Sequence, residues 1–439
     1  MKKSLLLVVL SLVLVATMAV TSAGAATKSV TMVVRHTQLG EAKQQRLNIL
    51  TDVLKKVQKD VSGVEFKLDG VDSDVNRKEK LRSEMATDSA PPIFDLFGGA
   101  DTQLYASEGK LLDLTPILKE LGLTSKFISL DEFKVNGKVY GLPIGGYQEG
   151  YFYNRDYFTA KGLTIPKTLD ELDQLAAKIK KDGKTPFAQA SKAAWVPLMT
   201  ANTLWARYAG PTITSGFATG KTKWNSPEMV AAFNKYADWV KKGYFKKGEL
   251  GLDYAEQRNQ LIRGEAIMMY DGSWASSVFA DPKQAGKMTN KVGYFPMPKA
   301  TKGKGDQTWV NGGFSNGYGF SAKVAKDPKQ LAVVKSFIKN MYNDEMQIRG
   351  LEADGVLPSM KIDSAKLAKA KVSDLVKVII AVGNRAGGAF PAFDSLVQPD
   401  VNTAISEGIQ KLIGGKTTAK AMLDSVQKVQ ETANEDSDN

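Results

Sequence analysis

The sequence contains very few side chains that could act as nucleophiles or as ligands of a transition metal. It has no cysteine and a single histidine, His36, among 439 residues. A disulfide framework, a thiolate metal site and a cysteine nucleophile are therefore excluded, and a serine–histidine–aspartate triad would have to use His36. Zinc sites usually draw on several His, Cys or carboxylate ligands. We predict no catalytic residue, no metal site and no cofactor.

Polar and aromatic side chains instead gather where predicted strands end. His36 and Gln38 follow the first predicted strand, and Phe97 and Asp101 follow the third. In doubly wound α/β sheets, ligands lie outside the carboxyl ends of the strands, so these four residues are candidates for ligand contact. A structural role for His36 and helix N-capping by Asp101 are the alternatives.

The elements that position these residues follow from the pattern of apolar positions. Residues 29–34 and 64–68 read as strands, and 93–97 as a buried strand. Residues 41–61 carry apolar side chains at spacings of three and four, which predicts a helix, and a second helix is expected over 75–87. Alternating strands and helices predict a parallel sheet covered by helices.

Helix-start signals continue through the rest of the chain. Thr168 with Glu171 forms a capping box, and the pairs Ser226–Pro227 and Asp327–Pro328 are typical of helix N-termini. The stretch 397–429 is predicted to be helical with a break at Gly414–Gly415. The whole chain therefore reads as α/β.

The N-terminus indicates export. Met1-Lys2-Lys3 precedes an apolar run over 5–20 and a small-residue stretch, which is typical of a secretory signal peptide over residues 1–25. The predicted location is the periplasm or the extracellular cell-envelope space. Because there is no cysteine, lipid anchoring through an N-terminal cysteine is excluded.

The charge is basic but dispersed. The formal net charge of +12 becomes +10 when Lys2 and Lys3 leave with the signal peptide. The basic residues occur as separate pairs on predicted helices, whereas a nucleic-acid surface would more often be a concentrated stripe. We therefore expect no nucleic-acid partner.

Several motifs, in order along the chain, resemble extracellular solute-binding proteins of the maltose-binding type. Two of them adjoin each other, Asn136–Pro143 and Tyr151–Asp156. The others are Phe94–Phe97 with Glu108–Leu114, Gly264–Met269 with Asp271–Trp274, Val292–Pro298, and Asn311–Phe320. Their order behind a signal peptide makes the resemblance specific over about residues 29–430.

The resemblance implies a two-lobed periplasmic-binding-protein fold of type II, with hinge crossings and a ligand cleft between the lobes. The expected N-terminal lobe comprises residues 27–143 and 299–356, and the C-terminal lobe 144–298 and 357–439. The resemblance implies a monomeric binding protein and not an enzyme. Such a protein delivers a sugar, here expected to be an oligosaccharide, to the membrane subunits of an ATP-binding-cassette importer. The chain has no Walker-A loop of its own.

The resemblance also implies a set of ligand contacts. Aromatic rings can cover the C–H faces of a sugar while polar side chains pair with its hydroxyls. The strongest candidate for stacking is Trp274, with Asp271 as a hydroxyl acceptor and one of Trp195 and Trp205 as a second aromatic wall. Further candidates are Tyr147, Gln148, Glu149, Asn311, Gly312, Gly313, Phe390, Phe393 and Arg385. Core packing is the alternative for the two phenylalanines. The two glycines are expected to allow close approach of the backbone to the ligand.

Two alternatives remain open from the sequence. A glycoside hydrolase needs two carboxylates about 5–10 Å apart, which a chain with 47 acidic residues could supply. Alternatively, the ligand could be charged: an acidic sugar such as a uronate would pair with Arg35, Arg207 or Arg385. A polyamine would instead need carboxylates such as Asp101, Glu149 and Asp271.

Overall fold

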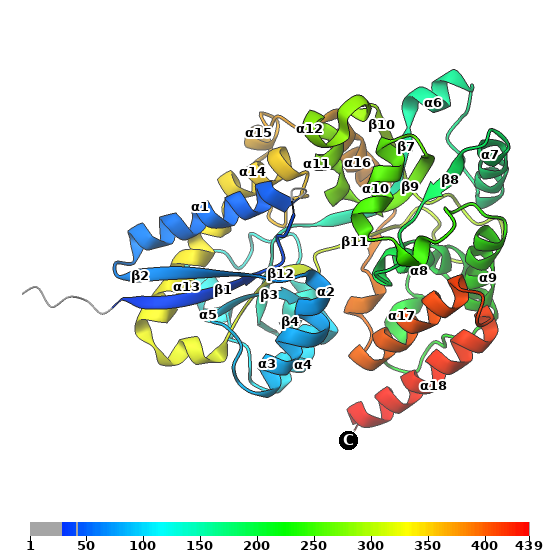
Figure 1. Cartoon of the computed structure of the whole chain (residues 1–439). Coiled ribbons are helices and arrows are strands. Elements are labelled where there is room, and N and C mark those ends of the chain that lie inside the picture. The colour runs from blue at the N-terminus through cyan, green and yellow to red at the C-terminus, as the bar shows by residue number, and fades with distance from the viewer. Residues whose placement is uncertain (1–28, 41–42, 439) are drawn as a thin grey trace, which may run out of the picture.

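The structure is a computed structural model that describes residues 29–40 and 43–438. The predicted signal peptide lies outside these residues. Two lobes, each built around one β-sheet, lie side by side in Figure 1. The α/β two-lobed fold predicted from the sequence is therefore confirmed.

The first lobe contains a five-stranded mixed sheet in the order β2-β1-β3-β12-β6. β1 runs parallel to β2 and β3, whereas β12 runs antiparallel to β3 and β6. The three strands predicted from the sequence are therefore parallel, as expected, and the antiparallel strand β12 comes from a later segment of the chain. The strands are β1 (Val30–His36), β2 (Val64–Gly70), β3 (Ile93–Phe97), β6 (Gly141–Pro143) and β12 (Asn316–Phe320).

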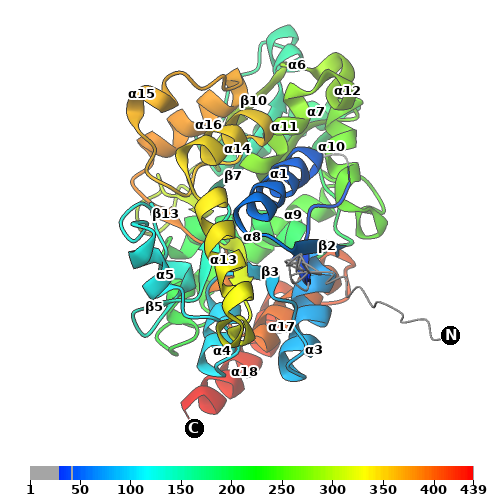
Figure 2. The same cartoon turned by 90° about the vertical axis from the view of Figure 1, so that its left-hand side faces the viewer.

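Helices cover this sheet through apolar faces. α1 (Gln44–Asp60) buries Leu50, Leu54 and Val57, as its spacing predicts, and lies beside α13 (Pro328–Met341) in Figure 2. The predicted helix over 75–87 is α2 (Ser73–Val75) continuing through a π-helical turn (Asn76–Lys80) into α3 (Leu81–Ala86). The remaining elements of this lobe are α4 (Ala100–Ser107), α5 (Thr115–Glu120), β4 (Lys134–Val135), β5 (Lys138–Val139), α14 (Asp344–Asp354) and α15 (Ser364–Leu367).

The second lobe contains a six-stranded sheet. Its strands run in the order β13-β11-β7-β9-β8, and β10 also pairs with β7. They are β7 (Tyr147–Asn154), β8 (Thr185–Ala188), β9 (Ala266–Gly272), β10 (Val292–Phe295), β11 (Val310–Gly313) and β13 (Ala389–Phe390). Its helices are α6 (Arg155–Ala160), α7 (Leu169–Lys181), α8 (Trp195–Ala209), α9 (Pro227–Lys241), α10 (Tyr254–Ile262), α11 (Ser276–Ala280), α12 (Pro282–Ala285), α16 (Asp374–Arg385), α17 (Pro399–Ile413) and α18 (Ala419–Asp438).

The predicted helix caps are present. Thr168 accepts a hydrogen bond from the Glu171 N–H, Ser226 from the Met229 N–H, and Asp327 from the N–H of Gln330. Each side chain satisfies a backbone donor that the first turn of a helix leaves free.

Three chain segments connect the lobes, and two of them differ from the expected lobe boundaries. β6 leads into β7 through residues 144–146. The next crossing lies at 314–315, because β11 pairs with β7 and β13 of the second sheet and β12 pairs with the first. Residues 299–313 therefore pack with the second lobe, not the first as predicted. Past Leu357 the chain still packs on the first lobe, through Met360, and crosses only before α16.

A buried carboxyl in the second lobe gives the fold a specific pH dependence. Glu249 is 4% exposed and accepts a hydrogen bond from Ser191 Oγ at 2.8 Å. Burial raises the pKa of Glu249 to about 7, although the Ser191 hydrogen bond acts to lower it. Between about pH 4.5 and about pH 7, the folded protein therefore holds a proton that the unfolded chain has lost.

We expect this proton to stabilise the protein below about pH 4.5 and its contribution to disappear as the pH rises through about 7. The free energy of unfolding, measured by urea titration, should lose on the order of 3 kcal/mol between pH 5 and pH 8 from this group. Glu249→Gln should remove that part of the slope, while the exposed Glu407→Gln should not. An unchanged slope in Glu249→Gln would contradict the assignment.

Candidate ligand-binding site

Trp274 lies just after β9, and its ring packs against Gly272, the last residue of that strand. A Cβ atom added at Gly272 would overlap the Trp274 ring, so glycine is required for the indole to lie flat on the strand end. The ring is partly buried and its centroid is 5.8 Å from that of Tyr147, with the planes inclined by 57°. The two rings form a small aromatic surface where β7 and β9 meet the interlobe crossings.

A hydrogen-bond network around Tyr254 holds Trp274 in place. The Tyr254 hydroxyl accepts a hydrogen bond from Trp274 Nε1 at 2.6 Å and donates to Asp271 Oδ1 at 2.5 Å. Arg258 contacts the same hydroxyl and donates from Nε to Asp271 Oδ2 at 3.2 Å. The Gly272 N–H also donates to Asp271.

Both oxygens of the fully buried Asp271 are therefore occupied within the protein. Asp271 was predicted to accept a ligand hydroxyl, but its contacts make it a support for Tyr254 and Trp274.

The two tryptophans left open by the sequence lie in different surroundings. Both belong to helix α8. Trp195 is partly exposed at the start of the helix, with its ring centroid 4.6 Å from that of Tyr254. Trp205 is fully buried among Trp224, Phe233 and Phe393. Trp195 is thus the residue that borders the aromatic surface.

Three buried polar side chains with unpartnered atoms adjoin this surface. β11 pairs antiparallel with β7, with Gly312 opposite Gln148, so the next residues along, Asn311 and Glu149, lie side by side. Asn311 Nδ2 donates to Asn202 Oδ1 on α8 at 3.3 Å. All three residues are at most 3% exposed, yet Glu149 Oε2, Asn202 Nδ2 and Asn311 Oδ1 have no hydrogen-bond partner. We call Glu149, Asn202 and Asn311 the polar row.

Glu149 is an unusual member of the row because it is buried among other carboxylates. Burial, and then the negative charges of Asp394 and Asp271, raise the pKa of Glu149 well above its usual range. An unpartnered buried polar atom destabilises a protein by about 1–3 kcal/mol, and such groups in a native structure call for an explanation. A ligand that supplies the missing partners is one such explanation.

Several predicted contacts point away from the aromatic surface. Gln148 lies on the opposite face of β7, where its amide donates to the Tyr294 hydroxyl and to the Ile379 carbonyl. Phe390 and Phe393 are buried in the second-lobe core, and Arg385 is exposed at the end of α16.

The two predicted glycines are explained by the protein itself. A Cβ at Gly312 would lie 2.8 Å from the Tyr147 carbonyl oxygen, and one at Gly313 would lie 2.8 Å from Glu132 Oε1. Both residues precede the second crossing, whereas the sequence placed them after it. Close packing against neighbouring segments of the chain accounts for these glycines without a ligand.

The predicted first-lobe residues lie at the ends of β1 and β3, as expected, and are largely engaged. His36 is buried and its Nδ1 accepts the Gln38 N–H at 3.2 Å; burial lowers the pKa of His36, while Asp69 opposes that shift. Gln38 Oε1 is buried without a partner. Asp101 is not free, because it is paired with Arg77.

Arg77 connects the two lobes. Its guanidinium lies 3.6 Å above the Phe97 ring and donates from Nε to Asp101 Oδ2 at 2.5 Å, both within the first lobe. On the other side it pairs with the Asp394 carboxylate of the second lobe and donates from Nη2 to the Asp394 carbonyl at 2.7 Å. Burial alone would lower the pKa of Arg77, but Asp101 and Asp394 outweigh it and raise the pKa.

The lobes also touch through their backbones beside this ion pair. Gly99 has φ +76°, and a Cβ atom added there would overlap the Ser395 carbonyl of the second lobe. A more exposed pair, Arg82 with Asp400 at 3.5 Å, bridges the same two lobes. The structure therefore has the lobes in contact at this edge, close to the polar row.

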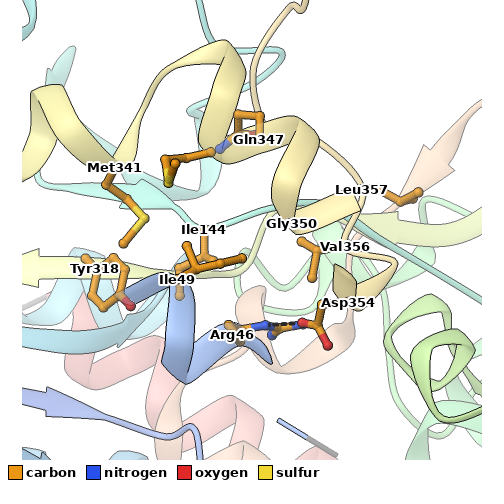
Figure 3. Close-up of a pocket in the computed structure, with 11 residues that line it drawn as sticks. Arg46, Ile49, Ile144, Tyr318, Met341, Gln347, Gly350, Asp354, Val356 and Leu357 are labelled. Atoms are coloured by element: carbon orange, nitrogen blue, oxygen red, sulfur yellow. Dashed lines mark hydrogen bonds and ion pairs between the residues drawn. The ribbon is translucent and has the colours of Figure 1, made fainter. Parts of the chain in front are cut away.

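Two recesses lie on the first lobe. The larger one lies beneath α1, α13 and α14, where Arg46 pairs with Asp354, and Ile144 of the first crossing and Leu357 border it (Figure 3). None of the predicted ligand contacts lines it. The smaller one is lined by Arg77, Phe97 and Asp101 among others.

The arginines suspected of binding an acidic sugar are mostly occupied. Arg35 pairs with Asp69 and Glu84 inside the first lobe. Arg207 donates to the carbonyl oxygens of Met297 and Trp309. These contacts explain both side chains without an anionic ligand.

Sequence reasoning missed five residues that shape this region: Tyr254, Arg258, Asn202, Arg77 and Asp394. A signal existed for the first two, because positions i and i+4 of a helix share a face and this helix directly precedes β9. Asn202 stands out as a polar residue in an apolar helix. Nothing local marks Arg77 and Asp394, which are 317 positions apart.

Residues 29–40 and 43–438 contain neither a candidate membrane-spanning helix nor a candidate metal-binding cluster. No helix there has the length and apolar character needed to cross a membrane. No cluster of three or more His, Cys, Asp or Glu side chains in this part of the chain is arranged to hold a metal ion.

Comparison with known proteins identifies the family. Residues 43–348 match the model of the bacterial extracellular solute-binding proteins. A solved structure of a chitin oligosaccharide binding protein is 42% identical, with a TM-score of 0.88 over 93% of this chain and 99% of that one.

Two curated relatives are more distant. The multiple sugar-binding protein of Streptococcus mutans is 24% identical over 63% of this chain and 64% of its own length. The diacetylchitobiose binding protein DasA of Streptomyces coelicolor is 24% identical over 64% of this chain and 63% of its own. Both alignments span slightly less than two thirds of these relatives. The family match and the similar structure together confirm the resemblance seen in the motifs: the chain belongs to the bacterial extracellular solute-binding protein family.

Proposed function

We propose that this protein is the exported binding subunit of an ATP-binding-cassette importer and captures an oligosaccharide between its lobes. The observation that carries the proposal is the aromatic surface of Trp274 and Tyr147 beside the unpartnered polar row. Rings and buried hydrogen-bonding groups side by side match a ligand with C–H faces and polar edges. The 42% identical chitin oligosaccharide binding protein makes chito-oligosaccharides the first ligands to test.

The mechanism we propose is hinge closure around the ligand. The polar row is buried, so the lobes must separate at the Arg77–Asp394 contact before a sugar can enter. Ligand contacts from both lobes would then stabilise the closed form, which the importer's membrane subunits recognise. In this proposal the protein acts as a monomer, without a lipid anchor, and returns its ligand chemically unchanged, so it is not an enzyme.

A thermal-shift screen of the mature protein against mono- and oligosaccharides tests the ligand class, with calorimetry for each hit. A ligand at a hundred times its Kd should stabilise the folded state by about 2.7 kcal/mol. We expect chito-oligosaccharides to stabilise it most, with affinity nearly independent of salt. Recovery of the intact sugar after prolonged incubation would support binding without turnover.

Three results would count against the proposal. Shortened products would indicate a hydrolase. A uronate or a polyamine as the strongest hit, with salt-sensitive affinity, would indicate a charged ligand. Small-angle scattering that shows no compaction with saturating ligand would contradict hinge closure.

A further inference from the structure

The polar row offers a donor and an acceptor whose identities are determined by the backbone. The Phe393 N–H donates to Asn202 Oδ1 at 2.9 Å, which orients the Asn202 amide because only its oxygen can accept. Asn311 must then present its Nδ2 to that same oxygen, at 3.3 Å. Asn202 Nδ2 is thus left as a free donor and Asn311 Oδ1 as a free acceptor.

The position of this amide pair relative to the rings limits which chemical group of a ligand could bind to it. Glu149 is opposite Gly272 on β9, and the Trp274 ring occupies the space over Gly272. Asn311 lies on the other side of Glu149. Three groups therefore lie in a row across the second sheet: the Trp274 ring at β9, the Glu149 carboxyl on β7 and the amide pair at β11. Neighbouring strands of a sheet are about 5 Å apart.

A secondary amide carries what the Asn202–Asn311 pair lacks. It has one C=O acceptor and one N–H donor held rigidly on one plane, together with an apolar methyl in the case of an acetamido group. A hydroxyl can also donate and accept at the same time, but it does so from a single atom, whereas an acetamido group carries its donor and its acceptor on two separate atoms. Sites built to hydrogen-bond a specific group reject analogues that lack it, since their buried atoms stay unpaired.

We propose that Asn202 and Asn311, beside Glu149, read the 2-acetamido group of an N-acetylated sugar and so determine specificity for chito- over cello-oligosaccharides. Asn202 Nδ2 donates to the acetamido carbonyl, and Asn311 Oδ1 accepts from its N–H. The inference rests on the proposed function, because it needs a sugar bound between the lobes. It adds the residues that select among sugars of equal length.

The test compares three trisaccharides on the mature protein by calorimetry: N,N′,N″-triacetylchitotriose, cellotriose and the glucosamine trimer. The wild type should prefer triacetylchitotriose over cellotriose by at least about a hundredfold. Asn311→Ala should reduce that preference to below about fivefold, mainly by weakening triacetylchitotriose binding. Asn340→Ala removes an amide on the outer side of the first lobe, bonded to Asp60 and Ser336, and should leave the preference unchanged.

Several outcomes would overturn the inference. If triacetylchitotriose binds and Asn311→Ala keeps the full preference, the amide pair is not the reader and the proposed function still stands. Preference for the glucosamine trimer, lost in Glu149→Gln, would show that the row reads a cation. If no sugar in the wider screen binds, the proposed function itself fails. If Asn311→Ala does not fold, Asn311→Ser takes its place. The wild type is also a test by itself, because equal affinity for triacetylchitotriose and cellotriose would exclude recognition of the acetamido group.

Discussion

Replacing Trp274 with alanine is expected to weaken ligand binding at least thirtyfold while leaving the fold intact. The indole is a partly exposed ring next to the polar row, and removing a central aromatic anchor typically weakens binding by about 2 kcal/mol or more, where about 1.4 kcal/mol is a factor of ten. Calorimetry with the best sugar from the screen measures the change, and circular dichroism checks the fold.

Trp274→Phe is the matched control. It keeps an aromatic face but loses the Nε1–H that donates to Tyr254, so its affinity should fall between wild type and alanine. Tyr254→Phe should act in the same direction with a smaller effect, because it releases Trp274 and Asp271 without removing the ring. Normal binding by a folded Trp274→Ala protein would refute the assignment of Trp274 as the stacking residue.

The second large effect is expected at the contact between the lobes. Asp394→Asn removes the interlobe charge pair but leaves Arg77 paired with Asp101, so the cation is not stranded. Truncating one partner of a buried, hydrogen-bonded charge pair weakens the contact between the two surfaces by about 2–5 kcal/mol. Because the lost contact exists only when the lobes touch, the affinity for sugar should fall at least tenfold. Small-angle scattering should show a more open average shape.

Asp400→Asn provides the control for that experiment. It also removes an interlobe pair, with Arg82, but this pair is exposed and 3.5 Å long, and exposed pairs contribute about 0–1 kcal/mol. Its affinity should stay within a few-fold of wild type. Equal effects of the two variants would indicate a general charge effect and would refute a specific role for Arg77 and Asp394.

Local sequence signals predicted the elements of this fold well because their causes are local. The spacing of Leu50, Leu54 and Val57 determines one face of α1, and the caps at Thr168 and Ser226 satisfy the first turns of their own helices. The order of the motifs along the chain indicated the family. The pleat of β7 explains why Glu149 belongs to the polar row and its neighbour Gln148 does not: successive residues of a strand point to opposite faces.

The crossing points were harder to predict because they depend on partners distant in the sequence. Val310–Gly313 is a short strand whose own residues do not state whether it joins the sheet of β12 or that of β7. Its pairing with Tyr147 and Gln148 decides the question. The same applies to residues 357–361, which stay with the first lobe because Met360 packs in its core.

The sequence by itself determined that the chain is an α/β protein with one histidine and no cysteine, and which residues end its strands. Only the tertiary structure decided which of those residues are free to meet a ligand. Asp271 and Asp101 looked available, but Tyr254, Arg258 and Arg77 occupy them. Asn202 and Asn311, 109 positions apart, acquire a joint role only when α8 packs on β11. Hydrogen-bond satisfaction depends on which groups meet in space, and a linear pattern does not contain that information.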